Sequence, residues 1–122
     1  MNQVGAGIAI TGSGSANLET TLDNHQLSQM VETSDQWIRS RTGICERHLA
    51  NPQGSLSAIA ATAAQQALAM ADIRASDLDL IVLATSTPDD LFGCASQVQA
   101  LLGASNAVAF DLTAACSGFV FG

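Results

Sequence analysis

The chain has 122 residues, of which 48% are hydrophobic and 12% charged, a composition typical of a globular domain with a buried core and not of a disordered segment. Its formal net charge of −7 argues against a nucleic-acid partner, whose phosphates require a basic surface. No apolar run approaches the length of a membrane span, and the first residues lack the pattern of a secretion signal, so we expect a cytoplasmic protein with no membrane partner.

The cysteines and histidines do not form a metal-binding or disulfide pattern. Cys45, Cys94 and Cys116 are odd in number and irregularly spaced. His25 and His48 have polar neighbours and no CxxC partner, so we interpret both as surface residues and predict no metal site.

The first fourteen residues predict a strand, marked by Val4, Ile8 and Ile10, that ends in a Gly/Ser loop. Its spaced glycines are not read as a dinucleotide-binding fingerprint, because no helix opens on them. The next predicted helix begins at Asp23, which can cap it while Gln26 reaches back to form a capping box.

A second capping box is predicted at Thr33–Gln36, with Thr33 as the N-cap of a helix that ends at Gly43. Trp37 and Arg41 lie at i and i+4, hence on one face of that helix. An indole beside a guanidinium can clamp a flat, phosphate-bearing group, because the ring stacks on a purine and the arginine pairs with a phosphate. On spacing alone, a core tryptophan beside a solvated arginine is the commoner arrangement. The chain has no lysine, and three of its four arginines fall in or just after this helix, which favours an anion-binding role.

A helix capped by Ser55 or Ser57 follows, with an uncharged body over Ala58–Ala71. A helix this apolar is usually covered on more than one side, although its many alanines also fit an outer helix with a bland face. Three further elements follow in the order strand, helix, strand: Leu80–Thr85, Ala95–Leu102 and Val108–Leu112. The continuous apolar run of the first of these strands predicts burial on both faces. This alternation is typical of an α/β fold with a mostly parallel sheet covered by helices, without a linker or internal repeat.

A tight turn of small residues, Thr113–Ala115, separates the last predicted strand from a helix that starts near Cys116. A cysteine there points its sulfur beyond the carboxyl end of the sheet, where α/β proteins bind their ligands. The free N–H groups and the positive end of the helix dipole favour the thiolate, which is the reactive form. From composition alone, a small buried hydrophobe that fills the corner is the commoner role of such a cysteine.

Three stretches resemble the β-ketoacyl-acyl carrier protein synthase III family of thiolase-like condensing enzymes: AFDLTAACSGFVFG, ETSDQWIRSRTGICERH and LIVLATSTPDDLF. The resemblance implies a thiolase-like fold, of which residues 1–122 form the N-terminal portion. It implies that Cys116 is the catalytic nucleophile and that Trp37 stacks on the adenine of coenzyme A. It also implies that Arg41 contacts the nucleotide and that Thr33 lies beside the same base.

The resemblance further implies that Phe92 crosses a homodimer interface and lines the acyl pocket of the partner. Two short stretches depart from the family pattern: the link Gly93–Ser96 is one residue shorter and lacks a proline, and Asn17-Leu18 replaces a leucine–proline pair. No histidine follows Cys116, and the histidine and asparagine that complete the family's site have no equivalent here. We therefore expect a truncated chain that does not catalyse alone.

For the complete protein, the resemblance implies that Cys116 takes the acetyl group of acetyl-coenzyme A and that malonyl-acyl carrier protein condenses with it after losing carbon dioxide. No cofactor is implied, because the coenzyme A thioester is a substrate. Two alternatives stay open. One is another condensing enzyme of the same fold, such as a polyketide or alkylquinolone priming synthase. The other is a non-catalytic fragment that only dimerises or binds acyl-coenzyme A.

Overall fold

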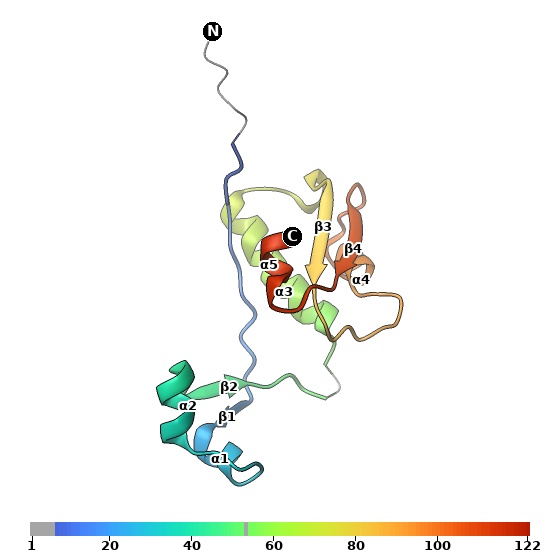
Figure 1. Cartoon of the computed structure of the whole chain (residues 1–122). Helices are drawn as coiled ribbons and strands as arrows, with labels where there is room; N and C mark the ends of the chain where they lie inside the picture. The colour runs from blue at the N-terminus through green and yellow to red at the C-terminus, as the bar shows by residue number, and fades with distance from the viewer. Residues whose placement is uncertain (1–6, 53) are drawn as a thin grey trace. The chain divides into compact units, whose positions relative to one another are not determined.

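The computed structural model describes residues 7–52 and 54–122, and the chain divides into two compact units (Figure 1). The small unit is Asn17–Gly54, and the sheet unit combines Met1–Ala16 with Ser55–Gly122. None of the helices described is long and apolar enough to cross a membrane.

The small unit is a two-stranded antiparallel sheet with two helices. Its elements are β1 (Thr21–Asp23), α1 (Asn24–Ser28), α2 (Asp35–Thr42) and β2 (Glu46–His48), with β1 paired to β2. The predicted capping box at the start of α1 is confirmed: the Asp23 carboxylate accepts the Gln26 N–H at 2.7 Å, and Gln26 Oε1 accepts the Asp23 N–H at 3.0 Å.

The predicted start of α2 is wrong by one residue. Ser34, not Thr33, is the N-cap, and its hydroxyl accepts the N–H of Trp37 at 3.2 Å. With the cap at Ser34, Gln36 is the second helical residue and cannot complete a capping box, which needs the third. The predicted end is confirmed, since Gly43 caps α2 with a φ of 72°, where glycine is favoured.

The sheet unit is built on two parallel strands. β3 (Leu80–Ala84) pairs residue for residue with β4 (Val108–Leu112), and α4 (Ala95–Leu102) lies between them in the chain and contacts both. This confirms the predicted order of strand, helix and strand. The strands are parallel because α4 returns the chain to the end of the sheet at which β3 began, so β4 starts from that same end.

α3 (Leu56–Ala71) packs against α4. Ser55 is its N-cap, one of the two candidates in the sequence, and Asp72 ends it in the left-handed region with a φ of 54°. Within α3 only Ser57 and Ala61 are buried. Of the two alternatives for this helix, the outer helix with a bland face therefore agrees with the described part of the chain.

The Gly/Ser segment before the small unit lies along α3. The Ser15 N–H donates to Gln66 Oε1 at 3.2 Å, and a Cβ on Gly14 would fall 2.0 Å from the Ala63 carbonyl oxygen. The predicted first strand is wrong over its described residues: Ile8 and Ile10 are unpaired extended chain and largely exposed, and Val4 lies outside the described residues. A strand needs a neighbouring strand, and none of the described strands pairs with this segment.

The core of the sheet unit is made of small apolar side chains: Ala61, Cys94, Ala95, Val98, Ala104 and Ala107. The prediction that β3 is buried on both faces is wrong for the described residues, because Leu80 is 53% exposed and the inner residues of the strand are only half-buried. β3 has β4 as its only strand neighbour among those residues, and a central strand is covered only where strands and helices surround it.

Candidate active site

Cys116 lies in the turn that follows β4, at the carboxyl end of the sheet. Just beyond the strands, the Thr85 N–H donates to the Leu112 carbonyl at 3.1 Å, and the Thr113 hydroxyl donates to the Thr85 carbonyl at 3.2 Å. Cys116 then falls in a 3₁₀ turn, Ala115–Ser117, with an exposed side chain. The interpretation as a buried hydrophobe therefore does not describe this cysteine in the structure.

Two backbone features make this turn tight. Ala115 has a φ of 44°, in the left-handed region that costs a residue with a Cβ about 1–2 kcal/mol. Gly118, the first residue of α5 (Gly118–Phe121), is buried, and a Cβ there would lie 2.8 Å from the Cβ of Ala84. The predicted helix after the cysteine is confirmed. Cys116 is not its first residue, because it lies in the 3₁₀ turn that directly precedes α5.

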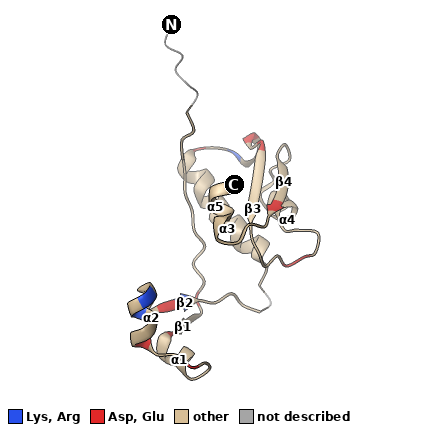
Figure 2. Cartoon of the chain, in the orientation of Figure 1, with Lys and Arg blue, Asp and Glu red and all other residues tan. Residues whose placement is uncertain are grey.

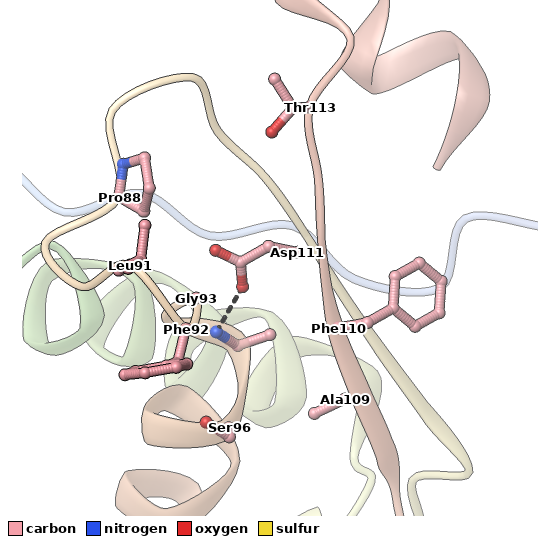
Figure 3. A pocket seen from close by; sticks show the side chains of 10 residues that line it. Pro88, Leu91, Phe92, Gly93, Ser96, Ala109, Phe110, Asp111 and Thr113 are labelled. Carbon is pink, nitrogen blue, oxygen red and sulfur yellow. Dashed lines mark hydrogen bonds between the residues drawn. The ribbon is translucent and has the colours of Figure 1, made fainter.

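Phe92 stands at the tip of the loop between β3 and α4 and is 92% exposed. Leu91, Phe92 and Asp111 are among the residues that line a hollow of about 370 Å³ beside this loop (Figure 3). An exposed phenylalanine at a loop tip is suited to a contact outside its own unit. The sequence pattern did not single out Asp111, whose partners lie sixteen and seventeen residues before it.

Thr33 and Trp37 come together in the small unit. They line a hollow of about 340 Å³ with Glu32 and Ser34. Trp37 is 58% exposed, so the interpretation as a core tryptophan is wrong for the described part of the chain. Glu32 and Ser34 were not predicted as lining residues. Their only signal in the sequence is their position beside Thr33.

The cluster of arginines divides into paired and free side chains. Arg39 Nε donates to Asp35 at 2.7 Å, and an Arg47 guanidinium N–H donates to Asn24 Oδ1 at 2.7 Å. Arg41, exposed on α2, has no hydrogen bond or ion pair with any residue that the structure describes. Of these three arginines, two on α2 and one on β2 (Figure 2), only Arg41 is therefore unpaired within the described part of the chain and available to an anion.

The ion pair of α2 shifts the titration of both partners. The hydrogen bond from Arg39, assisted by that from Asn24, lowers the pKa of Asp35 below its ordinary value. In turn the hydrogen bond to Asp35 raises the pKa of Arg39. Both groups therefore stay charged at neutral pH and hold each other.

The predicted site residues fall into two groups. Thr33, Trp37 and Arg41 belong to the small unit, and Cys116 and Phe92 belong to the sheet unit. His25 and His48 are exposed residues of the small unit, as predicted. Over residues 7–52 and 54–122, no three histidine, cysteine or acidic side chains lie where they could hold a metal ion.

Comparison with known proteins finds no matching family model, but it finds close relatives. The chain is 67% identical over its whole length to the β-ketoacyl-[acyl-carrier-protein] synthase III of Acaryochloris marina, of which it covers 37%. Over 95% of its length it is 71% identical to the synthase III of Trichormus variabilis, of which it covers 35%. The chain thus spans little more than a third of the curated relatives that it matches.

Solved structures agree with the sequence relatives. The crystal structure of 3-oxoacyl-[acyl-carrier-protein] synthase III from Aquifex aeolicus superposes on 94% of this chain with a TM-score of 0.87 and 44% identity, and the chain covers 37% of it. A priming β-ketosynthase of a polyketide pathway superposes on 92% of the chain with a TM-score of 0.85 and 31% identity, and the chain covers 34% of that structure. In sequence and in fold, the chain matches the N-terminal portion of β-ketoacyl-[acyl-carrier-protein] synthase III, a thiolase-like condensing enzyme.

Proposed function

We propose that this chain is the nucleophile-bearing part of a β-ketoacyl-acyl carrier protein synthase III that starts fatty acid synthesis. The observation that carries the proposal is the exposed thiol of Cys116 in a tight turn after β4, in a chain 67% identical to a protein named as such a synthase. A thiol at the carboxyl end of a parallel sheet lies where α/β enzymes bind substrates.

The reaction divides into two thiol-based steps. The Cys116 thiolate attacks the thioester carbonyl of acetyl-coenzyme A, and coenzyme A leaves as its thiol. Malonyl-acyl carrier protein then loses carbon dioxide, and its carbanion attacks the acetyl-cysteine. This forms the carbon–carbon bond of a 3-oxoacyl carrier protein and frees the sulfur of Cys116. The backbone N–H of Cys116 can donate to the oxyanion. The family resemblance assigns the rest of the site to a histidine and an asparagine from the second half of the full-length protein, and completion of the oxyanion hole to a glycine-rich loop near its end.

The small unit supports a role in coenzyme A binding. Trp37 presents an exposed ring beside a hollow that Thr33 also lines, and this arrangement suits a flat adenine. Arg41, on the same helix, has no partner among the described residues, so its guanidinium is free to pair with a phosphate. We assign adenine stacking to Trp37, a contact with the same base to Thr33, and nucleotide binding to Arg41.

The remaining assignments follow the same family. We propose that the full-length protein is a cytoplasmic homodimer, and that Phe92 reaches the acyl pocket of the partner subunit. Its 92% exposure in this unit supports a contact made outside the unit.

The proposal is tested in a chimera that joins residues 1–122 to the rest of the Acaryochloris marina relative. Purified chimera is incubated with acetyl-coenzyme A and malonyl-acyl carrier protein, and acetylated peptides and 3-oxoacyl product are measured by mass spectrometry. We expect acetylation at Cys116 and loss of product in Cys116→Ala. Cys45→Ala is the matched control, because Cys45 is also an exposed cysteine. Product formation undiminished in Cys116→Ala contradicts the proposal.

A second candidate is the priming synthase of a polyketide pathway, which is supported by the TM-score of 0.85 to a priming β-ketosynthase of such a pathway. Comparing acetyl-coenzyme A with a series of longer acyl-coenzyme A substrates in the same chimera separates the two. A higher kcat/KM for a longer primer identifies the second candidate.

Alkylation tests the non-catalytic alternative without any substrate. We expect iodoacetamide to label Cys116 of the chimera at least about tenfold faster than Cys45 near neutral pH, because an activated thiol has more thiolate. Equal rates at these two exposed cysteines favour a protein that binds acyl-coenzyme A without catalysis.

A further inference from the structure

The loop between β3 and α4 has a fixed base and a free tip. At the tip, Leu91 is 93% and Phe92 is 92% exposed. At the base, Cys94 and Ala95 are among the most buried residues of the sheet unit, 0% and 1% exposed. What holds the buried residues that directly follow Phe92 therefore helps to set the position of the phenylalanine.

The side chain that holds this base is Asp111, the last residue but one of β4. Its two carboxylate oxygens both lie 2.9 Å from the Cys94 nitrogen, and Oδ1 accepts the Ala95 N–H at 2.6 Å. Figure 3 shows the carboxylate pointing from the strand toward Gly93 and Phe92. The loop base is thus tied to β4 by charge-assisted hydrogen bonds, which are stronger than neutral ones.

Asp111 takes the place of a local helix cap. Cys94 is the N-cap residue of α4 and has no side-chain capping hydrogen bond of its own. The first N–H groups of a helix need acceptors, and a negative charge there is also favoured by the helix dipole. A carboxylate from another strand satisfies both needs, so removing it affects the helix start and the loop together.

The loop backbone lies directly against this carboxylate. A Cβ on Gly93 would lie 3.0–3.2 Å from the carboxyl atoms of Asp111, and Gly93 has a φ of 91°, where a side chain is strained. Gly93 is the neighbour of Phe92 in the chain. A shift of the Asp111 carboxylate therefore moves the backbone that carries the phenylalanine.

A second carboxylate holds the same loop from the other side. Asp89 accepts the Leu56 N–H at 2.5 Å and the Ser55 hydroxyl at 3.3 Å, at the start of α3. Between these two anchors the loop is held by local hydrogen bonds: the Phe92 N–H donates to Asp90 Oδ1 at 2.9 Å, and the Gly93 N–H donates to the Asp90 carbonyl at 3.1 Å. The two anchors leave little room for Phe92 to move other than by movement of the loop base.

We propose that Asp111 is a positioning residue that sets acyl-chain selectivity by holding the loop of Phe92. This inference rests on the proposed function, in which Phe92 lines an acyl pocket. Asp111 lies only five positions before Cys116 on the same segment, so one strand positions both the nucleophile and the loop. Substitution of Asp111 changes which acyl chain is preferred, in addition to any change in overall rate.

The test uses the chimera with three variants. Asp111→Ala removes both acceptor oxygens, and Asp111→Asn keeps one and retains the shape. Asp79→Ala is the matched control, because Asp79 is an exposed aspartate just before β3 whose side chain makes no hydrogen bond to the described residues. Two quantities are measured in each: amide hydrogen exchange over residues 90–96, and the ratio of kcat/KM for acetyl- and octanoyl-coenzyme A.

We expect exchange over residues 90–96 to rise at least about tenfold in Asp111→Ala, because the Cys94 and Ala95 N–H groups both lose a charged acceptor and the loss of one such bond already has an effect of that size. We expect the kcat/KM ratio to shift by about tenfold in the same variant. Asp111→Asn should show a smaller change in both quantities, and Asp79→Ala should match the parent. If Asp111→Ala does not fold, the test rests on the hydrogen exchange and the kcat/KM ratio of Asp111→Asn.

Unchanged exchange in the Asp111 variants overturns the inference, because the carboxylate then does not hold the loop. Raised exchange with a ratio within twofold of the parent also overturns it, because the loop then does not set selectivity. A parent chimera that forms no 3-oxoacyl product refutes the proposed function, and hydrogen exchange still decides whether Asp111 anchors the loop.

Discussion

The two units of this chain are stabilised by different kinds of contact. The small unit has a buried polar centre: Asn24 is 1% exposed, and its amide donates to Asp35 and to the Ile44 carbonyl, both at 2.8 Å, while its oxygen accepts from Arg47. In the sheet unit the buried core is made of small apolar residues, and Gly118 packs closely against Ala84.

This difference predicts opposite sensitivities. A buried hydrogen-bond hub is damaged by losing a partner, because the groups left behind are unsatisfied. A close contact between small residues is damaged by added volume. The small unit should therefore be sensitive to truncation of polar side chains, and the sheet unit to enlargement of small ones.

The largest effect is expected for Asn24→Ala. It removes three hydrogen bonds and leaves Asp35, Arg47 and the Ile44 carbonyl each without one partner, for a loss of about 3 kcal/mol. Urea unfolding followed by fluorescence of Trp37, the only tryptophan, measures it in the small unit. Asn106→Ala is the control, because the exposed Asn106 amide makes a single hydrogen bond, to the Ser76 carbonyl. Equal losses in the two variants contradict the buried hub.

Gly118→Ala is the corresponding test of the sheet unit. The added methyl group would lie 2.8 Å from the Cβ of Ala84, and overpacking of this kind costs about 1–3 kcal/mol. Circular dichroism during thermal unfolding measures the loss. Ala84→Gly in the same background should restore part of the stability, since it removes the atom that the new methyl group meets. No loss in Gly118→Ala would show that α5 does not approach β3 this closely.

A smaller and opposite effect is expected for Ala115→Gly. Glycine has no Cβ to oppose the φ of 44°, so this variant should be more stable by about 0.5–1 kcal/mol. Ala114→Gly is the control, because Ala114 has a φ of −143° and gains nothing from the change. Thermal unfolding of both variants distinguishes relief of backbone strain from a general effect of glycine.

The smallest effect concerns the pH dependence of the small unit. The pKa of Asp35 is lowered in the folded chain, chiefly by Arg39, so its contribution to stability is present above the unfolded pKa, near 3.8, and is lost as the pH falls through the folded pKa. Asp35→Asn should therefore unfold with less dependence on pH below about 4 than the parent. Both partners are exposed, so added salt should reduce the difference.

Asp77→Asn sharpens this comparison. The pKa of Asp77 in the sheet unit is also lowered, chiefly by its hydrogen bond with Arg74, but it lacks a buried amide donor such as Asn24. We expect a weaker loss of acid dependence in Asp77→Asn than in Asp35→Asn. The opposite order would show that the amide of Asn24 adds nothing to the effect of the ion pair on the pKa of Asp35.

Elements with local signals could be predicted from the sequence. The helix Ala95–Leu102 has the predicted bounds, and the end of α2 at Gly43 follows from the preference of glycine for positive φ. The strand before Cys116 is also confirmed, and the turn of small residues that follows it is a local signal for its end. The resemblance to condensing enzymes is supported by the superposed synthase III structure.

Features that depend on distant partners could not be predicted. The use of Arg39 and Arg47 inside the small unit depends on Asp35 and Asn24, and nothing in the spacing of the arginines indicates it. The anchoring by Asp111 crosses from one strand to another element. The burial predicted for β3 was wrong because burial depends on neighbouring strands and helices, not on the strand itself.

The position of Asp111 also explains how α4 begins at Ala95 although the side chain of its N-cap residue, Cys94, makes no capping hydrogen bond. When a helix is capped from a neighbouring strand, the connecting segment needs no capping residue of its own. Substitutions in the loop before Cys94 should therefore leave the start of α4 intact, provided that the aspartate is kept.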